Sequence, residues 1–196
     1  MPGFANTSLT VAEAAYVSGV PERVVNHEID AGILRSTGGK ERRAIRGADL
    51  LYLSAVRDLR RHMTPQLRKR VREAIASAVT RARPVAKVDA FEMKIADMWQ
   101  EVVANFSVLE RAKRDHIESR PGVLAGEPVI RGTRIPARLV ADLIKQGYSK
   151  KNIRDEYDLT PEQIDAAVIF DRVSPKRGRP AIRKLAVKKR HVPADR

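Results

Sequence analysis

The stretch from Gly122 to Pro136 constrains the fold of this 196-residue chain more than any other. It reads Gly-Val-Leu-Ala-Gly-Glu-Pro-Val-Ile-Arg-Gly-Thr-Arg-Ile-Pro, so three glycines and two prolines interrupt short apolar runs. Glycine adopts backbone angles that are closed to other residues, which predicts tight turns around a short strand, Val129-Ile130. Pro136 then begins a helix, because the first helical position loses nothing when its N–H is missing. The segment therefore predicts a β-arch that leads into a helix.

The net charge of +14 is distributed unevenly along the chain. Basic residues exceed acidic ones by one in residues 1–60, by seven in 61–87 and by eight in 173–196, whereas acidic residues exceed basic ones by two in 88–172. A strongly basic chain favours a polyanionic partner, which is either nucleic acid or an acidic protein surface. The basic charge lies in a connector and in a tail.

Several classes of protein are disfavoured by the sequence. The chain has no cysteine, which fits a reducing cytoplasm, and it has neither a signal-peptide pattern nor an apolar run of about 20 residues. Its four histidines share no metal-ligand spacing, and the residues around Gly39-Lys40 lack the pattern of a phosphate-binding loop. We therefore expect a cytoplasmic protein that is not an enzyme, does not bind a membrane, and needs neither cofactor nor metal.

The expected fold class is mainly α with small β elements. The length suits two small domains joined by a connector. The predicted boundaries are residues 1–62 for a winged helix-turn-helix, 63–116 for a basic connector and dimerisation region, 117–172 for a β-arch with three helices, and 173–196 for a flexible basic tail.

The first domain is predicted from helix caps and apolar spacing. Thr10 and Glu13 form a capping box, and Gly19 ends the first helix. Pro21 begins a second helix that ends at Gly32, and the short link between the two is typical of a helix-turn-helix.

A β-hairpin and a third helix are expected to complete this domain. The hairpin strands are 33–36 and 42–45, around a glycine-rich tip, and form the wing. A helix over 48–62 then closes the core with Leu50, Leu51, Leu53, Val56 and Leu59.

Residues 19–34 resemble the helix-turn-helix of the MerR family, with the glycines in register. The resemblance implies that Arg23 contacts DNA, whereas Asn26, His27 and Glu28 replace the arginine and paired tyrosines usual in that family. Two arginines in the wing, Arg42 and Arg43, are suited to anchor phosphates. The alternative is a small winged domain that contacts another protein.

The connector is expected to begin with a strongly basic helix. Thr64-Pro65 caps a helix through about Arg83, whose basic residues have Glu73 as their sole acidic neighbour. This basic run fits a surface that contacts DNA or a partner protein. The alternative is an ordinary solvated helix face. A strand over 91–95 and then a helix through about Arg114 are expected next. The apolar residues of this helix, from Trp99 to Leu109, are expected to form part of the core or a dimer interface. The residues predicted to contact DNA are Arg23, Asn26, His27, Lys40, Arg42, Arg43, Arg68, Lys69 and Arg72.

Three helices are predicted after the arch. They begin at Pro136, at Ser149, and at Thr160, where Thr160-Pro161-Glu162-Gln163 is a capping box. Residues 118–170 resemble a domain of unknown function found in VapB-type antitoxins, through Gly126–Pro136, Gly147-Tyr148-Ser149 and Leu159–Ile164. The resemblance implies a homodimeric, homeodomain-like module that supports binding to a PIN-domain ribonuclease toxin.

The tail has too little apolar area to fold alone. Arg177-Gly178-Arg179-Pro180 is similar to the centre of an AT-hook, which enters the DNA minor groove. Alternatively, the tail docks on a toxin through its apolar residues while an arginine pairs with carboxylates of the toxin, or it only aids solubility. The residues predicted to bind toxin or minor groove are Arg177, Arg179, Ile182, Arg183 and Leu185.

Together these features predict a dimeric type II antitoxin that binds operator DNA and neutralises a PIN-domain ribonuclease. The alternatives are a stand-alone dimeric transcription regulator, and an architectural DNA-binding protein that uses its tail. A neighbouring reading frame for a PIN-type protein discriminates between the first two.

Overall fold

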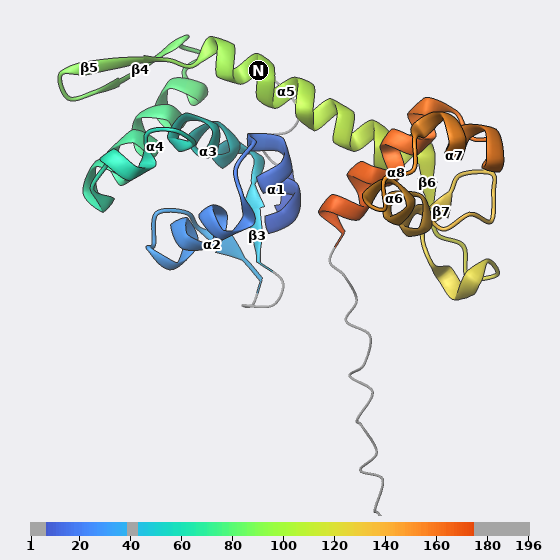
Figure 1. The fold of residues 1–196 in the computed structure, drawn as a ribbon. Helices are drawn as coiled ribbons and strands as arrows, with labels where there is room; N and C mark the ends of the chain where they lie inside the picture. Colours follow the sequence, from blue (N-terminus) through green and yellow to red (C-terminus); the bar gives the residue numbers. More distant parts are fainter. Residues whose placement is uncertain (1–6, 39–42, 175–196) are drawn as a thin grey trace, which may run out of the picture.

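The computed structural model describes residues 7–38 and 43–174 of the chain. The described part is mainly helical, with three small antiparallel sheets, which confirms the expected fold class (Figure 1). One long helix joins an N-terminal and a C-terminal group of elements. None of the helices in residues 7–38 and 43–174 is both long and apolar enough to cross a membrane.

The chain begins with the predicted pair of short helices. Helix α1 (Val11–Ser18) starts at the Thr10 capping box, in which the Glu13 carboxylate accepts a hydrogen bond from the Thr10 N–H at 2.8 Å. Gly19 ends α1 with a φ of 68°, an angle that a side chain would strain. Helix α2 (Glu22–Asp30) follows directly, so both helices of the predicted helix-turn-helix are present.

A three-stranded antiparallel sheet packs beside these helices. Strands β2 (Ser36–Thr37) and β3 (Ala44–Arg46) form the expected hairpin, although both are shorter than predicted. Strand β1 (Ser8–Thr10), which was not predicted, pairs with the other edge of β3, so the strand order is β1-β3-β2. Lys40 and Arg42 lie outside the described residues.

The predicted continuous helix over 48–62 is wrong in part. The structure has a 3-10 turn (Gly47–Asp49), helix α3 (Leu50–Val56) and a second 3-10 turn (Arg60–His62). Helix α3 buries all of its residues, including the predicted core leucines. Leu59 is 45% exposed, because the chain leaves the helix before its side chain can reach the core.

Helix α4 (Pro65–Thr80) has the predicted Thr64 cap, but it ends three residues earlier than expected. A positive φ of 52° at Ala82 turns the chain into strand β4 (Val85–Val88). Strand β4, which was not predicted, forms a hairpin with β5 (Phe91–Lys94), the expected strand. The Ile95 that was expected at the end of the strand is instead the residue that caps the next helix.

Helix α5 (Ala96–Arg111) continues into a π-helical turn (Ala112–His116) and ends close to the expected position. After it, β6 (Ile117–Glu118) pairs with β7 (Val129–Ile130), so the arch strand has a partner that was not predicted. The arch confirms the turn-rich interpretation, because positive φ angles occur at Leu124, Ala125, Gly126 and Gly132.

The last three helices are α6 (Ala137–Lys145), α7 (Lys150–Tyr157) and α8 (Pro161–Val173). Ser149 caps α7, and Thr160 and Gln163 form the predicted capping box of α8. Helix α8 packs along α6, and both contribute to a small core of their own, with Val140 and Ile164 fully buried.

The two cores are joined by side chains of α8. The larger core is built from α1 to α5, and it also includes Val173, which is 3% exposed. Helix α8 continues to Val173, the residue at which the predicted tail begins. The Arg172 guanidinium lies 5.3 Å from the ring centre of Tyr16 in α1, a cation–π contact between the two groups of elements.

Candidate nucleic-acid interface

Helix α2 presents a polar face outward and an apolar face to the core. Val25 is fully buried, whereas Arg23 and His27, one helical turn apart, are exposed. Neither Arg23 nor His27 has a hydrogen-bond or ion-pair partner among the described residues. These two side chains are free to contact an external group.

The hairpin is fixed to α2 by Arg43. Its guanidinium donates to the Asn26 amide oxygen at 3.1 Å and to the Asp30 carboxylate at 2.7 Å. The Asn26 amide group also donates to the Glu22 carbonyl at 3.2 Å. Asn26 and Arg43 were predicted to contact DNA, but in this structure they hold the hairpin against α2.

The inner side of α2 carries a buried carboxylate, that of Glu28, which is 0% exposed. It accepts hydrogen bonds from Tyr52 Oη and Arg60 Nε, both at 2.7 Å, and from the Arg68 guanidinium. Burial raises the pKa of the Tyr52 phenol, and the neighbouring Glu28 carboxylate raises it further, so the hydroxyl stays protonated and donates. Helix α2 is thereby fixed to α3 and α4.

Two of the predicted DNA-contacting residues have other partners. Arg68 is 6% exposed and buried against Glu28, so it cannot reach an external phosphate. Arg72 pairs with the buried Asp49 carboxylate at 2.8 Å, and its side chain is only 15% exposed. We therefore remove Arg68 and Arg72 from the predicted interface. Lys69, also on α4, is exposed.

Comparison with known proteins gives one family match, which lies in the C-terminal module. The sequence family described as "Protein of unknown function (DUF433)" matches residues 117–170. An uncharacterised protein of Sinorhizobium fredii, y4eO, is 38% identical over 69 residues, which are 35% of this chain and 31% of that protein. The chain thus matches less than a third of this relative.

A solved structure, that of Rv2018 from Mycobacterium tuberculosis, is 14% identical to the chain. The alignment covers 82% of this chain and 96% of that one, with a TM-score of 0.37. A TM-score this low supports no inference. The resemblances to MerR proteins and to VapB antitoxins stay predictions.

Within the matched module, the two arginines of the arch differ in role. Arg131 donates to the carbonyl oxygens of Arg114, at 2.7 Å, and Ile117, at 3.3 Å, and so ties the arch to the end of the π-helical turn. Its structural role agrees with the β-arch interpretation. Arg134 is exposed and has no partner among the described residues.

A pocket of about 610 Å³ lies beside the arch. Leu124 and Phe170 form part of its apolar wall, Arg138 and Asp171 line it as well, and Ser174, the last described residue, lies at its edge. Asp171 also pairs with Lys145 at 2.5 Å, and this hydrogen bond, the largest cause, raises the pKa of the Lys145 ammonium. In residues 7–38 and 43–174, no cluster of three or more histidine or acidic residues is suited to hold a metal.

The sequence predicted the exposed residues of α2 but not the buried side chains that hold this helix in place. The predicted tail residues, from Arg177 to Leu185, lie outside the described residues. Tyr52, Arg60 and Asp30 were not singled out, because their partners are 13 to 32 positions away in the chain. The departure of Glu28 from the MerR pattern was one visible signal of the buried network.

Proposed function

We propose that this protein is a type II antitoxin that binds its operator DNA and neutralises a PIN-domain ribonuclease. DNA binding is carried by α2 and the hairpin. The toxin is bound by the C-terminal module together with the basic tail. The protein acts in the cytoplasm as a homodimer and by binding rather than by catalysis.

The observation that carries DNA binding is the exposed pair Arg23 and His27 on α2. Their helix is fixed from behind by Glu28 and at its side by Arg43, so its orientation is rigid. A rigid helix with an unpaired guanidinium one turn from an imidazole suits the major groove, which admits an α-helix. A homodimer presents two such helices to a palindromic operator.

The toxin-binding half of the proposal has separate support. It rests on the resemblance of residues 118–170 to the antitoxin module and on the excess of eight basic residues in 173–196. The tail begins next to the pocket that Ser174 lines, so a toxin bound to the tail lies close to the C-terminal module.

Operator binding is tested by the salt dependence of affinity. Replacing Arg23→Gln removes one phosphate or base contact, so affinity for the DNA upstream of the gene falls and the slope of log K against log salt becomes shallower by about one. Arg154→Gln is the matched control, since Arg154 is exposed on α7 and pairs with Asp155 at 2.9 Å. An unchanged affinity and slope for the Arg23 variant would remove α2 from the interface.

A further inference from the structure

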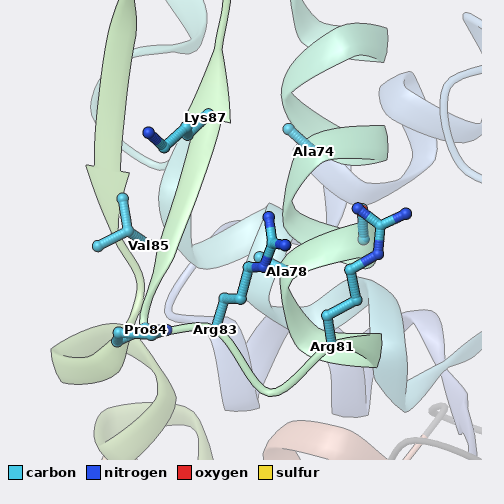
Figure 2. Close-up of a pocket in the computed structure, with 8 residues that line it drawn as sticks. Ala74, Ala78, Arg81, Arg83, Pro84, Val85 and Lys87 are labelled. Carbon is cyan, nitrogen blue, oxygen red and sulfur yellow. The ribbon is translucent and has the colours of Figure 1, made fainter.

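A groove of about 430 Å³ lies between the C-terminal half of α4 and strand β4 (Figure 2). Its apolar walls are formed by Ala74 and Ala78 of α4 and by Pro84 and Val85 at the start of β4. A volume of this size falls within the range typical of small-molecule sites, roughly 300–1,000 Å³. The groove has no part in the DNA or toxin contacts proposed above.

Two arginines line the groove, and their charges are not neutralised within the described structure. Figure 2 shows the guanidinium of Arg83 lying between α4 and β4, and Arg81 follows directly at the C-terminal end of α4. Both are exposed, and among the described residues neither has a hydrogen-bond or ion-pair partner. An anion bound between them would accept charge-assisted hydrogen bonds.

No acidic residue in the part of the chain that the structure describes lines the groove, and two acidic residues of the β4-β5 hairpin have other partners. Asp89 pairs with Arg70 at 2.7 Å, and Glu92 pairs with Lys87 at 2.8 Å across the hairpin. Lys87 therefore contributes no free charge, although it lines the groove. The positive potential of the groove comes from Arg81 and Arg83.

The backbone between the two arginines is strained. Ala82 has a φ of 52°, a left-handed conformation that costs an L-residue with a side chain roughly 1–2 kcal/mol. Hydrogen bonds from Ala82 N–H to the Val79 carbonyl and from Arg83 N–H to the Ala78 carbonyl, at 3.1 and 2.8 Å, hold this turn. These two bonds form a Schellman motif, a common helix end, and the turn brings Arg83 back beside the end of α4.

We propose that this groove binds a small organic anion with an apolar body. Its carboxylate or comparable anionic group lies between Arg81 and Arg83, and its hydrocarbon part contacts Ala74, Ala78 and Val85. The apolar walls distinguish such a ligand from inorganic phosphate or the sugar-phosphate backbone, which have little apolar surface to bury. Binding of this ligand in the groove depends neither on the proposed antitoxin activity nor on DNA binding.

The test uses hexanoate as the probe and the full-length chain. Methyl NMR signals of Ala74, Ala78 and Val85 are followed during titration with hexanoate, hexan-1-ol and inorganic phosphate. We expect saturable shifts with hexanoate, at a Kd at least tenfold lower than for either the neutral alcohol or phosphate, because each comparison removes one of the two contributions.

Two variants test whether the arginines of the groove bind the carboxylate of hexanoate. Arg81→Gln and Arg83→Gln should each raise the Kd for hexanoate about tenfold, whereas Arg134→Gln, at an exposed arginine of the C-terminal module, should not change it. All three positions are exposed, so the fold is retained, and dispersed NMR spectra verify this.

Four results would overturn the proposal. They are the absence of shifts at the three methyl groups, equal binding of hexan-1-ol, equal binding of phosphate, and an unchanged Kd in both groove variants. Equal binding of phosphate would indicate a simple anion site that a DNA phosphate occupies as well.

Discussion

Glu28 stabilises the protein through a buried charge network, and its removal should be costly. Replacing Glu28→Gln leaves the guanidinium of Arg68, whose side chain is 7% exposed, without a counter-charge. Removing one partner of a buried ion pair costs about 3–5 kcal/mol. We expect the free energy of unfolding in urea to fall by that amount.

Glu156→Gln is the control for this measurement, because Glu156 is exposed on α7 and should change stability by less than about 0.5 kcal/mol. A loss below about 1 kcal/mol for the Glu28 variant would contradict the network.

Glu13 should make stability depend on pH in the acidic range. Burial raises the pKa of its carboxyl. The Lys113 ammonium at 2.6 Å and the hydrogen bonds from Thr10 together lower the pKa by more than burial raises it, so the net pKa lies below 4.5. A depressed folded-state pKa stabilises the protein above the unfolded-state pKa, and this contribution is lost as the pH falls through the folded-state value.

The variant Glu13→Gln isolates this contribution. It should unfold more easily than the parent protein by about 1–2 kcal/mol at pH 7, and the difference should shrink at pH 3, which lies below the unfolded-state pKa of 4.5. Urea titrations at both pH values measure it. A difference that is equal at pH 7 and pH 3 would mean that Glu13 acts through packing rather than charge.

At the residue level, local patterns were predictable and buried ion pairs were not. Arg68 stands in a basic run, which favoured a surface role, yet it shares a helix face with the buried Val71, Ile75 and Ala78. That spacing was visible in the sequence. Its partner Glu28, 40 positions earlier in the chain, was not, because nothing local links the two residues.

Among the elements, the turn after α4 offers a direct test of backbone strain. Ala82→Gly relieves the left-handed conformation, while glycine loses more backbone entropy on folding, so the net gain in stability should be about 0.5–1 kcal/mol. Ala76→Gly, in the interior of the same helix, should instead cost about 1 kcal/mol. Thermal unfolding compares the two variants, and a loss of stability in both would show that Ala82 is not strained.

The helices were easier to predict than the strands. Capping boxes such as Thr10 with Glu13 and Thr160 with Gln163 act within one turn, so the sequence alone predicted the starts of α1 and α8. Strands β1, β4 and β6 have only two to four residues and no distinctive alternation. Strands β1 and β6 pair with β3 and β7, which come much later in the chain, whereas β4 pairs with the next strand, β5.

At the scale of the whole molecule, α5 and α8 connect the two groups of elements. The sequence predicted separate N-terminal and C-terminal units, and two cores are present. It did not predict that Val173 would be buried in the larger core or that Lys113 would pair with Glu13. Lys113 and Glu13 are 100 positions apart, and the composition of the chain gives no sign of their contact or of the burial of Val173.

The central claim is that the chain is a DNA-binding antitoxin, and its most direct test is growth of a bacterial host. The proposed toxin, a PIN-domain ribonuclease, is induced alone, with the full-length chain, or with a chain that ends at Val173. The proposed function predicts that the full-length chain restores growth and that the shortened chain, which lacks the basic tail, does not. Growth arrest that persists although the full-length chain accumulates in soluble form would contradict it.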